Sequence, residues 1–173
     1  MKYFIADLHF GDLNIMKIEN RPFCDVDEMA DTIVNNWNNI VSSDDEVFIA
    51  GDIAGVRPVN KDALLRFLEQ LNGRITIIAG NHDKDIIEDL RIWGYNVSEY
   101  PILIDGFWIV SHEPVYIVNK GPYANIFGHV HANPMYKTVS NRSYCVCVER
   151  NNYTPVSFDE IKKKVYAEDY KDD

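Results

Sequence analysis

The chain has 173 residues, of which 46% are hydrophobic and 25% charged, a composition typical of one globular domain. Its net charge of −10 argues against stable binding to nucleic acid, which depends on Lys and Arg side chains that neutralise phosphates. No apolar run approaches the roughly 20 residues of a membrane-spanning helix, and the N-terminus lacks the apolar region of a secretory signal. The odd number of cysteines, three, argues against a disulfide framework. We therefore expect a cytoplasmic protein, whose oligomeric state the sequence leaves open.

The first half of the chain alternates predicted strands and helices. The strands, rich in Ile, Val and Phe, are expected at residues 2–6, 46–50 and 74–79. The first helix begins after Asp25, which forms a capping-box pattern with Glu28. Two further helices are expected at about 61–71, with Gly73 as a stop signal, and about 84–93, ending at Gly94.

The second half is richer in predicted strands. Asp105-Gly106 stands between two apolar runs and predicts a two-residue hairpin turn. Short strands are expected at 123–127, 136–139 and 144–149, followed by a helix near 158–165. This order of elements favours an α/β (α+β) sandwich over a single doubly wound sheet. We expect one domain over residues 1–166 and a disordered acidic tail over 167–173.

All five histidines of the chain follow the end of an apolar, strand-like run within a few residues. The runs and their polar exits read "FIADLHFGD", "IIAGNHDKD", "WIVSHEP" and "IFGHVHANP", and "VFIAGDIAG" has the same shape with Asp52 in place of a histidine. Strand ends of a sheet meet at one edge, so loops distant in sequence converge there. The sequence therefore predicts one cluster of Asp, Asn and His side chains.

The residue types of this cluster indicate a metal site. In an extended segment, both members of an i, i+2 pair such as Asp7 and His9, or His129 and His131, can face one site. Imidazole and carboxylate together suit Mn, Fe, Zn or Ni. The number of such groups exceeds the needs of one ion and favours two, which is a common arrangement for cleaving phosphate esters. A structural zinc site is the alternative, but such sites favour thiolates, and the cysteines lie outside these segments.

In their order, these segments resemble the calcineurin-like metallophosphoesterase superfamily, whose pattern is D-x-H, G-D, G-N-H-[DE], H and G-H-x-H. Here the pattern reads Asp7-Leu8-His9, Gly51-Asp52, Gly80-Asn81-His82-Asp83, His112 and Gly128-His129-Val130-His131. "NRPF" and "NNWNNIV" further resemble a compact bacterial and phage-associated branch of this superfamily. The resemblance implies two mixed β-sheets packed as a sandwich and flanked by helices, in four layers.

The resemblance also implies a role for each motif residue. The first metal ion would be held by Asp7, His9 and His131, and the second by Asn81, His112 and His129, with Asp52 bridging. His82 would be the catalytic histidine that acts on the leaving group without binding metal. The cofactors implied are two divalent ions, with manganese expected and iron, zinc or nickel as alternatives.

The expected function is hydrolysis of phosphodiesters of small or nucleotide-like molecules. Two alternatives within enzymes share the ligand set: a phosphomonoesterase and a nucleoside-polyphosphate hydrolase. An alternative outside the enzymes is a non-catalytic protein-binding scaffold on the same fold. The protein phosphatases of the superfamily carry Asp and Arg shortly after G-D, where this chain has Gly55 and Val56, which argues against that activity. Candidate cations for contacting phosphate are Arg21, Arg57, Lys84, Lys120 and Arg142.

Overall fold

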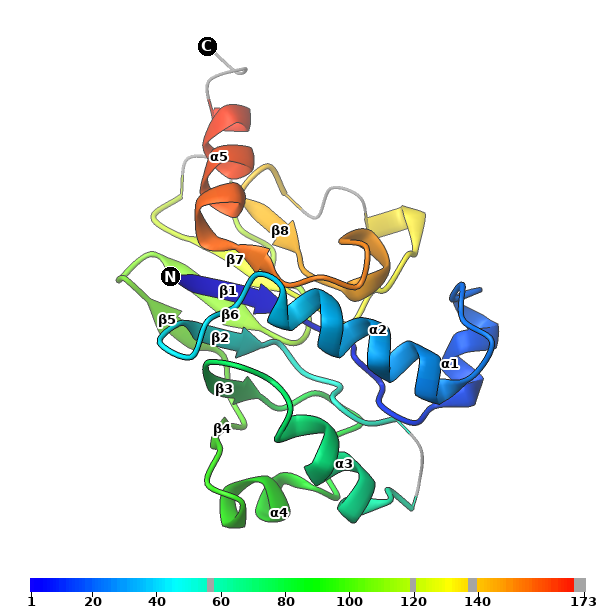
Figure 1. Cartoon of the computed structure of the whole chain (residues 1–173). Helices are drawn as coiled ribbons and strands as arrows, with labels where there is room; N and C mark the ends of the chain where they lie inside the picture. Colours follow the sequence, from blue (N-terminus) through cyan, green and yellow to red (C-terminus); the bar gives the residue numbers. More distant parts are fainter. Residues whose placement is uncertain (56–57, 119–120, 137–139, 170–173) are drawn as a thin grey trace.

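The computed structural model describes residues 1–55, 58–118, 121–136 and 140–169, and these form two mixed sheets with flanking helices (Figure 1). The first sheet has the order β4-β3-β2-β1-β9 and the second β5-β6-β7-β8. The strands of the first sheet are β1 (Lys2–Ile5), β2 (Glu46–Ile49), β3 (Arg74–Ile78), β4 (Asn96–Ser98) and β9 (Val156–Ser157). Those of the second are β5 (Ile102–Ile104), β6 (Trp108–Ser111), β7 (Ala124–Phe127) and β8 (Ser143–Cys145). This arrangement confirms the predicted α/β architecture.

The first sheet separates two hydrophobic cores, because successive side chains of a strand point to opposite faces. Ile5, Ile49 and Ile77 face the helices, whereas Phe4 and Ile78 face the core between the sheets. The helices are α1 (Leu13–Ile18), α2 (Val26–Asn38), α3 (Lys61–Leu68), α4 (Ile87–Ile92) and α5 (Phe158–Asp169). Helices α2, α3 and α4 cover the outer face of the first sheet, while α5 closes one side of the core between the sheets (Figure 1).

The predicted turn at Asp105-Gly106 is present. Both residues have positive φ, at 51° and 69°, and the N–H of Phe107 donates to the carbonyl oxygen of Ile104. These are the features of a type I′ turn, which matches the twist of an antiparallel pair. Ile104 pairs with Trp108, so Phe107 is an extra residue beside the turn. β5 and β6 therefore form the predicted hairpin with one bulge.

Some predicted elements differ from the structure. Residues 134–136 form a short 3-10 helix, η1 (Pro134–Tyr136), and not the start of a strand; 137–139 lie outside the described residues. The strand predicted at 144–149 ends at Cys145, and a second 3-10 helix, η2 (Val148–Arg150), follows. The apolar run continues to Val148, but the backbone turns there and places Glu149 beside the site described below.

The last helix is longer than expected. α5 extends to Asp169, three residues past the predicted end of the domain, and residues 170–173 lie outside the described part. Ala167 has the strongest intrinsic helix propensity, which favours continuation of α5. Among the described residues, no helix is long and apolar enough to cross a membrane.

Candidate metal centre

The predicted site residues lie in loops that follow five strands. In the first sheet, β1, β2 and β3 run parallel, and in the second sheet β6 and β7 run parallel. Within each sheet the loops at the carboxyl ends of these strands are therefore neighbours. Nine described residues other than glycine have positive φ, and five of them are predicted ligands: Asp7, His9, Asp52, His129 and His131. The D-x-H and H-x-H pairs therefore reach the site in left-handed conformations and not in the extended form expected from the sequence. Such conformations are sparsely populated outside functional sites.

Asp7, His9 and His131 form one potential metal-binding group, with ligand atoms that all lie within 4.8 Å of one another. Asp7 and His9 are buried. Both ring nitrogens of His9 are buried and lack a hydrogen-bond partner. Buried polar atoms without partners are costly in a folded protein, and a bound cation would satisfy the one that faces the group. The residues present therefore fit a divalent ion here.

Asp52, His112 and His129 form a second such group. Asn81 belongs to the same cluster, because its Oδ1 lies 2.9 Å from Nε2 of His112 and 3.0 Å from Nδ1 of His129. His112 donates its Nδ1–H to the carbonyl oxygen of Ala50 (2.9 Å), so its Nε2 faces the centre. A carbonyl partner of this kind fixes the orientation of many metal-binding histidines.

The carboxylate of Asp52 lies between the two groups. Its Oδ2 is 3.6 Å from Nε2 of His9 and 3.4 Å from Nε2 of His112. Its Oδ1 accepts the backbone N–H of His82 at 2.9 Å. The ring of His82 is half-buried and lies 5.2 Å from the ring of His9, measured between centroids, so it is at the edge of the first group.

The glycines of the motifs allow the loops to approach one another. A Cβ at Gly80 would overlap the carboxylate and backbone of Asp52, and one at Gly51 would overlap the ring of His112. At Gly55 a Cβ would overlap both His9 and Asp12. There is thus no room at Gly55 for the aspartate that the protein phosphatases carry, while Val56 and Arg57 lie outside the described residues.

Asp83 joins two of the loops, a role that the sequence analysis missed. Its side chain is fully buried and accepts the backbone N–H groups of Gly80 (2.8 Å), Asp52 (2.8 Å) and Ile53 (2.9 Å). Burial raises the pKa of Asp83, while these hydrogen bonds oppose the shift. The motif pattern G-N-H-[DE] contained the signal, because an acid after the histidine has no role as a ligand in the resemblance.

Glu149 was also missed, and it orients His131. Its Oε1 accepts from Nδ1 of His131 at 2.9 Å, which leaves Nε2 of that ring facing Asp7 at 3.7 Å. Arg21, expected as a candidate phosphate contact, instead lies buried beneath the site. It donates to Glu149 and to the carbonyl oxygens of Asp7 and Leu8. Its cation therefore holds the first loop in place and cannot reach a substrate.

The remaining candidate cations are placed as follows. Arg142 donates to the carbonyl oxygen of Gly121, and Lys84 lines a cavity beside Asn81. Arg57 and Lys120 lie outside the described residues.

In the metal-free site, Asp52 and His112 shift each other's pKa. Burial opposes ionisation of Asp52, but the contact with His112 outweighs it and lowers the pKa of Asp52 to about 2. In the same contact, Asp52 overcomes the effect of burial and raises the pKa of His112 to about 9. Burial raises the pKa of Asp7, against the opposing effects of His131 and His112. Cations that bind here must replace the proton of His112, and the buried carboxylates favour their entry.

Two groups of potential carboxylate and imidazole ligands lie at the joint edge of two mixed sheets, an arrangement that suits two metal ions. The chain belongs to the calcineurin-like phosphoesterase family, whose model matches residues 3–164. This membership confirms the resemblance seen in the motifs and implies divalent metal cofactors.

One relative of the chain matches most of its length and another about half of it. It is 39% identical over 170 residues to an uncharacterized protein of Methanocaldococcus jannaschii, a match that covers 94% of this chain and 90% of the relative. It is 36% identical over 81 residues to the Gene 66 protein of Mycobacterium phage L5, which covers 47% of this chain and 39% of the phage protein.

Two solved structures share the fold. A protein of unknown function from Aquifex aeolicus has a TM-score of 0.75 and 27% identity, with 94% of this chain and 98% of that chain covered. The Pseudomonas putida nuclease MPE has a TM-score of 0.52 and 18% identity, with 75% of this chain and 60% of the nuclease covered. The likeness to the nuclease concerns the fold alone.

Proposed function

We propose that this phosphoesterase hydrolyses phosphodiesters of small or nucleotide-like molecules at a binuclear metal centre. The observation that carries the proposal is the position of Asp52, whose Oδ2 lies within 3.6 Å of both His9 and His112. A carboxylate placed between two ligand groups can bind an ion on each side. Paired ions about 3.5–4 Å apart are a standard arrangement for cleaving phosphate esters.

The proposed ligands divide between the two groups. Asp7, His9 and His131 would hold the first ion, Asn81, His112 and His129 would hold the second, and Asp52 would contribute to both. A mixture of imidazole and carboxylate ligands suits manganese, which we propose, and also iron, zinc or nickel.

The residues of the chain would hold the two ions, and His82 would donate a proton to the leaving group. The two ions, when bound, would supply a water of lowered pKa as nucleophile and stabilise charge on the phosphoryl oxygens. His82 stands at the edge of the first group, and its backbone N–H is tied to Asp52. From there its protonated ring would donate to the oxygen of the leaving group, a contribution of roughly 10²–10⁴ to the rate.

The charge of the chain supports a small substrate over a nucleic-acid polymer. With a net charge of −10, the surface repels a polyanion, whereas a single phosphate ester needs only the local positive charge of two bound ions. Cys24, Cys145 and Cys147 are free thiols, which supports a reducing compartment such as the cytoplasm.

A screen of metals against substrates tests the proposal. Protein stripped of metal would be reloaded with Mn, Ni, Fe or Zn and assayed with bis-p-nitrophenyl phosphate and with p-nitrophenyl phosphate. We expect turnover of the diester to exceed that of the monoester, with Mn among the activating ions. Turnover of the monoester alone would favour the phosphomonoesterase, and metal-loaded protein without any esterase activity would favour a binding scaffold.

A further inference from the structure

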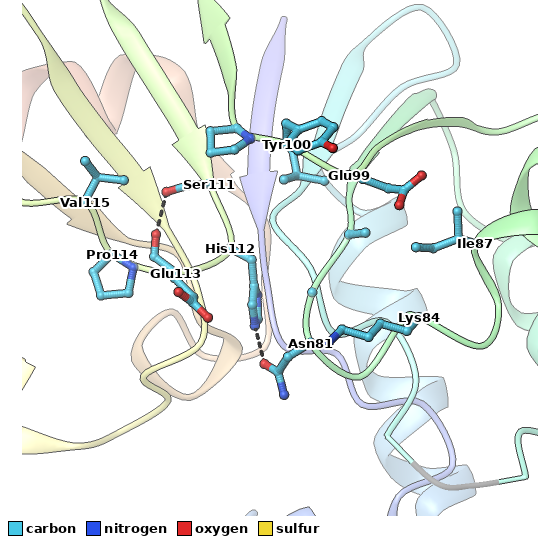
Figure 2. Close-up of a pocket in the computed structure, with 14 residues that line it drawn as sticks. Asn81, Lys84, Ile87, Glu99, Tyr100, Ser111, His112, Glu113, Pro114 and Val115 are labelled. Atoms are coloured by element: carbon cyan, nitrogen blue, oxygen red, sulfur yellow. Dashed lines mark hydrogen bonds between the residues drawn. The ribbon is translucent and has the colours of Figure 1, made fainter.

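A cavity of about 420 Å³ opens beside the second group of candidate ligands, with Asn81 and His112 at one end (Figure 2). We propose that it binds the retained organic group of a phosphodiester substrate, meaning the ester group that stays on phosphorus when the leaving group departs. The occupant is an uncharged, ring-bearing group of about nucleoside size. This inference rests on the proposed function and names the substrate class of the same site.

The position of the cavity assigns it to the retained group. Its lining includes the second-group residues Asn81 and His112, but neither His9 nor His82. His82, the proposed donor to the leaving group, stands beside His9 at the first group. A leaving group directed towards His82 therefore points away from the cavity, and the other ester group of the same phosphorus can point into it. A phosphomonoester has no such second group.

The size and the walls of the cavity suit a ring. Its volume lies within the range of roughly 300–1,000 Å³ that is common for small-ligand sites. Pro114 and Val115 form one wall, while Ile87 and Tyr100 belong to the other (Figure 2), and Pro101 also lines the cavity. Tyr100 is 78% exposed, so its aromatic face is available to stack on a flat ligand.

Side-chain hydrogen bonds hold both walls in place without a ligand. On one side, the fully buried Asn125 accepts the N–H of Val115 at 2.8 Å and donates to Ser111, whose hydroxyl donates to the carbonyl oxygen of Glu113. On the other, the hydroxyl of Ser98 bonds both the N–H and the carbonyl oxygen of Tyr100. Because the walls are already ordered, a ligand that binds in the cavity causes little further loss of conformational entropy.

The charges of the lining disfavour a further phosphate. Among the described residues of the lining, and apart from His112, Lys84 is the one cation, against the carboxylates of Glu99 and Glu113. Arg91 pairs with Glu99 at 2.7 Å and fixes its position on the rim. A nucleoside polyphosphate would bring additional negative charge to these carboxylates, whereas hydroxyl or amino groups of a nucleoside could donate hydrogen bonds to them.

Two substrates with one leaving group test the inference. Methyl p-nitrophenyl phosphate and thymidine 5′-(p-nitrophenyl phosphate) both release p-nitrophenolate and differ only in the retained group. We expect the manganese-loaded protein to have a KM for the thymidine ester at least tenfold below that for the methyl ester. The preference, taken as the ratio of the two kcat/KM values, should fall about tenfold in Tyr100→Ala, because stacking on an aromatic ring is lost. It should also disappear in Val115→Trp, which fills the cavity.

Matched variants outside the lining provide the controls. Tyr116 is 72% exposed and Val118 is 58% exposed, and both belong to the same loop as Val115. Tyr116→Ala and Val118→Trp should keep the wild-type preference. Equal kcat/KM for the two esters, or equal loss of preference in all four variants, would overturn the inference while turnover of the methyl ester upholds the proposed function. Absence of turnover of both esters would overturn the proposed function and the inference with it.

Discussion

Replacement of Asp83 by Asn tests how the two central loops are held together. The carboxylate accepts three backbone N–H groups: Oδ2 accepts those of Gly80 and Asp52, and Oδ1 accepts that of Ile53. An asparagine of the same shape can keep its carbonyl oxygen at the position of Oδ2. Its NH₂ group then faces the N–H of Ile53, so two donors meet in a site that is fully buried.

The expected cost follows from these contacts. A buried donor without an acceptor costs about 1–3 kcal/mol, and the two retained hydrogen bonds weaken when their acceptor is no longer ionised. We therefore expect Asp83→Asn to lower the free energy of unfolding by about 3 kcal/mol. For a chain of this size, each 1 kcal/mol lowers Tm by about 2–4 °C, which gives a shift of about 6–12 °C.

The assay is thermal and urea unfolding of metal-free protein, so that lost metal affinity does not contribute. Asp31→Asn, a change of the same charge at an exposed position of α2, is the control and should stay within about 0.5 kcal/mol of the wild type. If Asp83→Asn were as stable as this control, the carboxylate would not be what joins the loops, and the reasoning would be refuted.

Three further predictions concern the metal centre. His82→Ala should lower turnover by about 10²–10⁴ with metal content unchanged, whereas Asp52→Ala should lose metal; equal loss of metal in both would contradict the proposed roles. His112 has its pKa raised to about 9, so its protonation stabilises the metal-free protein below pH 6.5, and this contribution is lost as the pH rises through 9. The free energy of unfolding of metal-free protein should fall by up to about 3 kcal/mol over that range, and a His112→Asn variant should lack the trend in urea titrations. Glu149→Gln should weaken metal binding about 10–100-fold in calorimetric titrations, because Glu149 orients His131; unchanged affinity would exclude that role.

That the candidate ligands meet at one place could be predicted, because each of them follows an apolar strand and parallel strands bring such exits together. The residues that orient the ligands could not. Glu149 follows a cysteine-rich strand and looks like an ordinary surface acid until the turn into η2 brings it to 2.9 Å from His131. Arg21 was expected as a candidate phosphate contact, but it is 5% exposed, because it is buried by tertiary contacts with Glu149 and the first loop that no local pattern encodes.

Short elements were the part of the fold that the sequence did not reveal. α1 has six residues, which is too short for a clear helical period, although Asp12 caps it with its side chain. β9 has two residues and is defined by its pairing with Tyr3 and Phe4 of β1, a contact that no local pattern encodes. Such elements depend on tertiary contacts more than on local propensity.

Anomalous diffraction from crystals grown with manganese would test the central claim most directly. The account predicts two manganese peaks about 3.5–4 Å apart, one beside Asp7 and His131, the other beside Asn81 and His112, with the carboxylate of Asp52 between them. A single peak, or manganese bound away from Asp52, would contradict it.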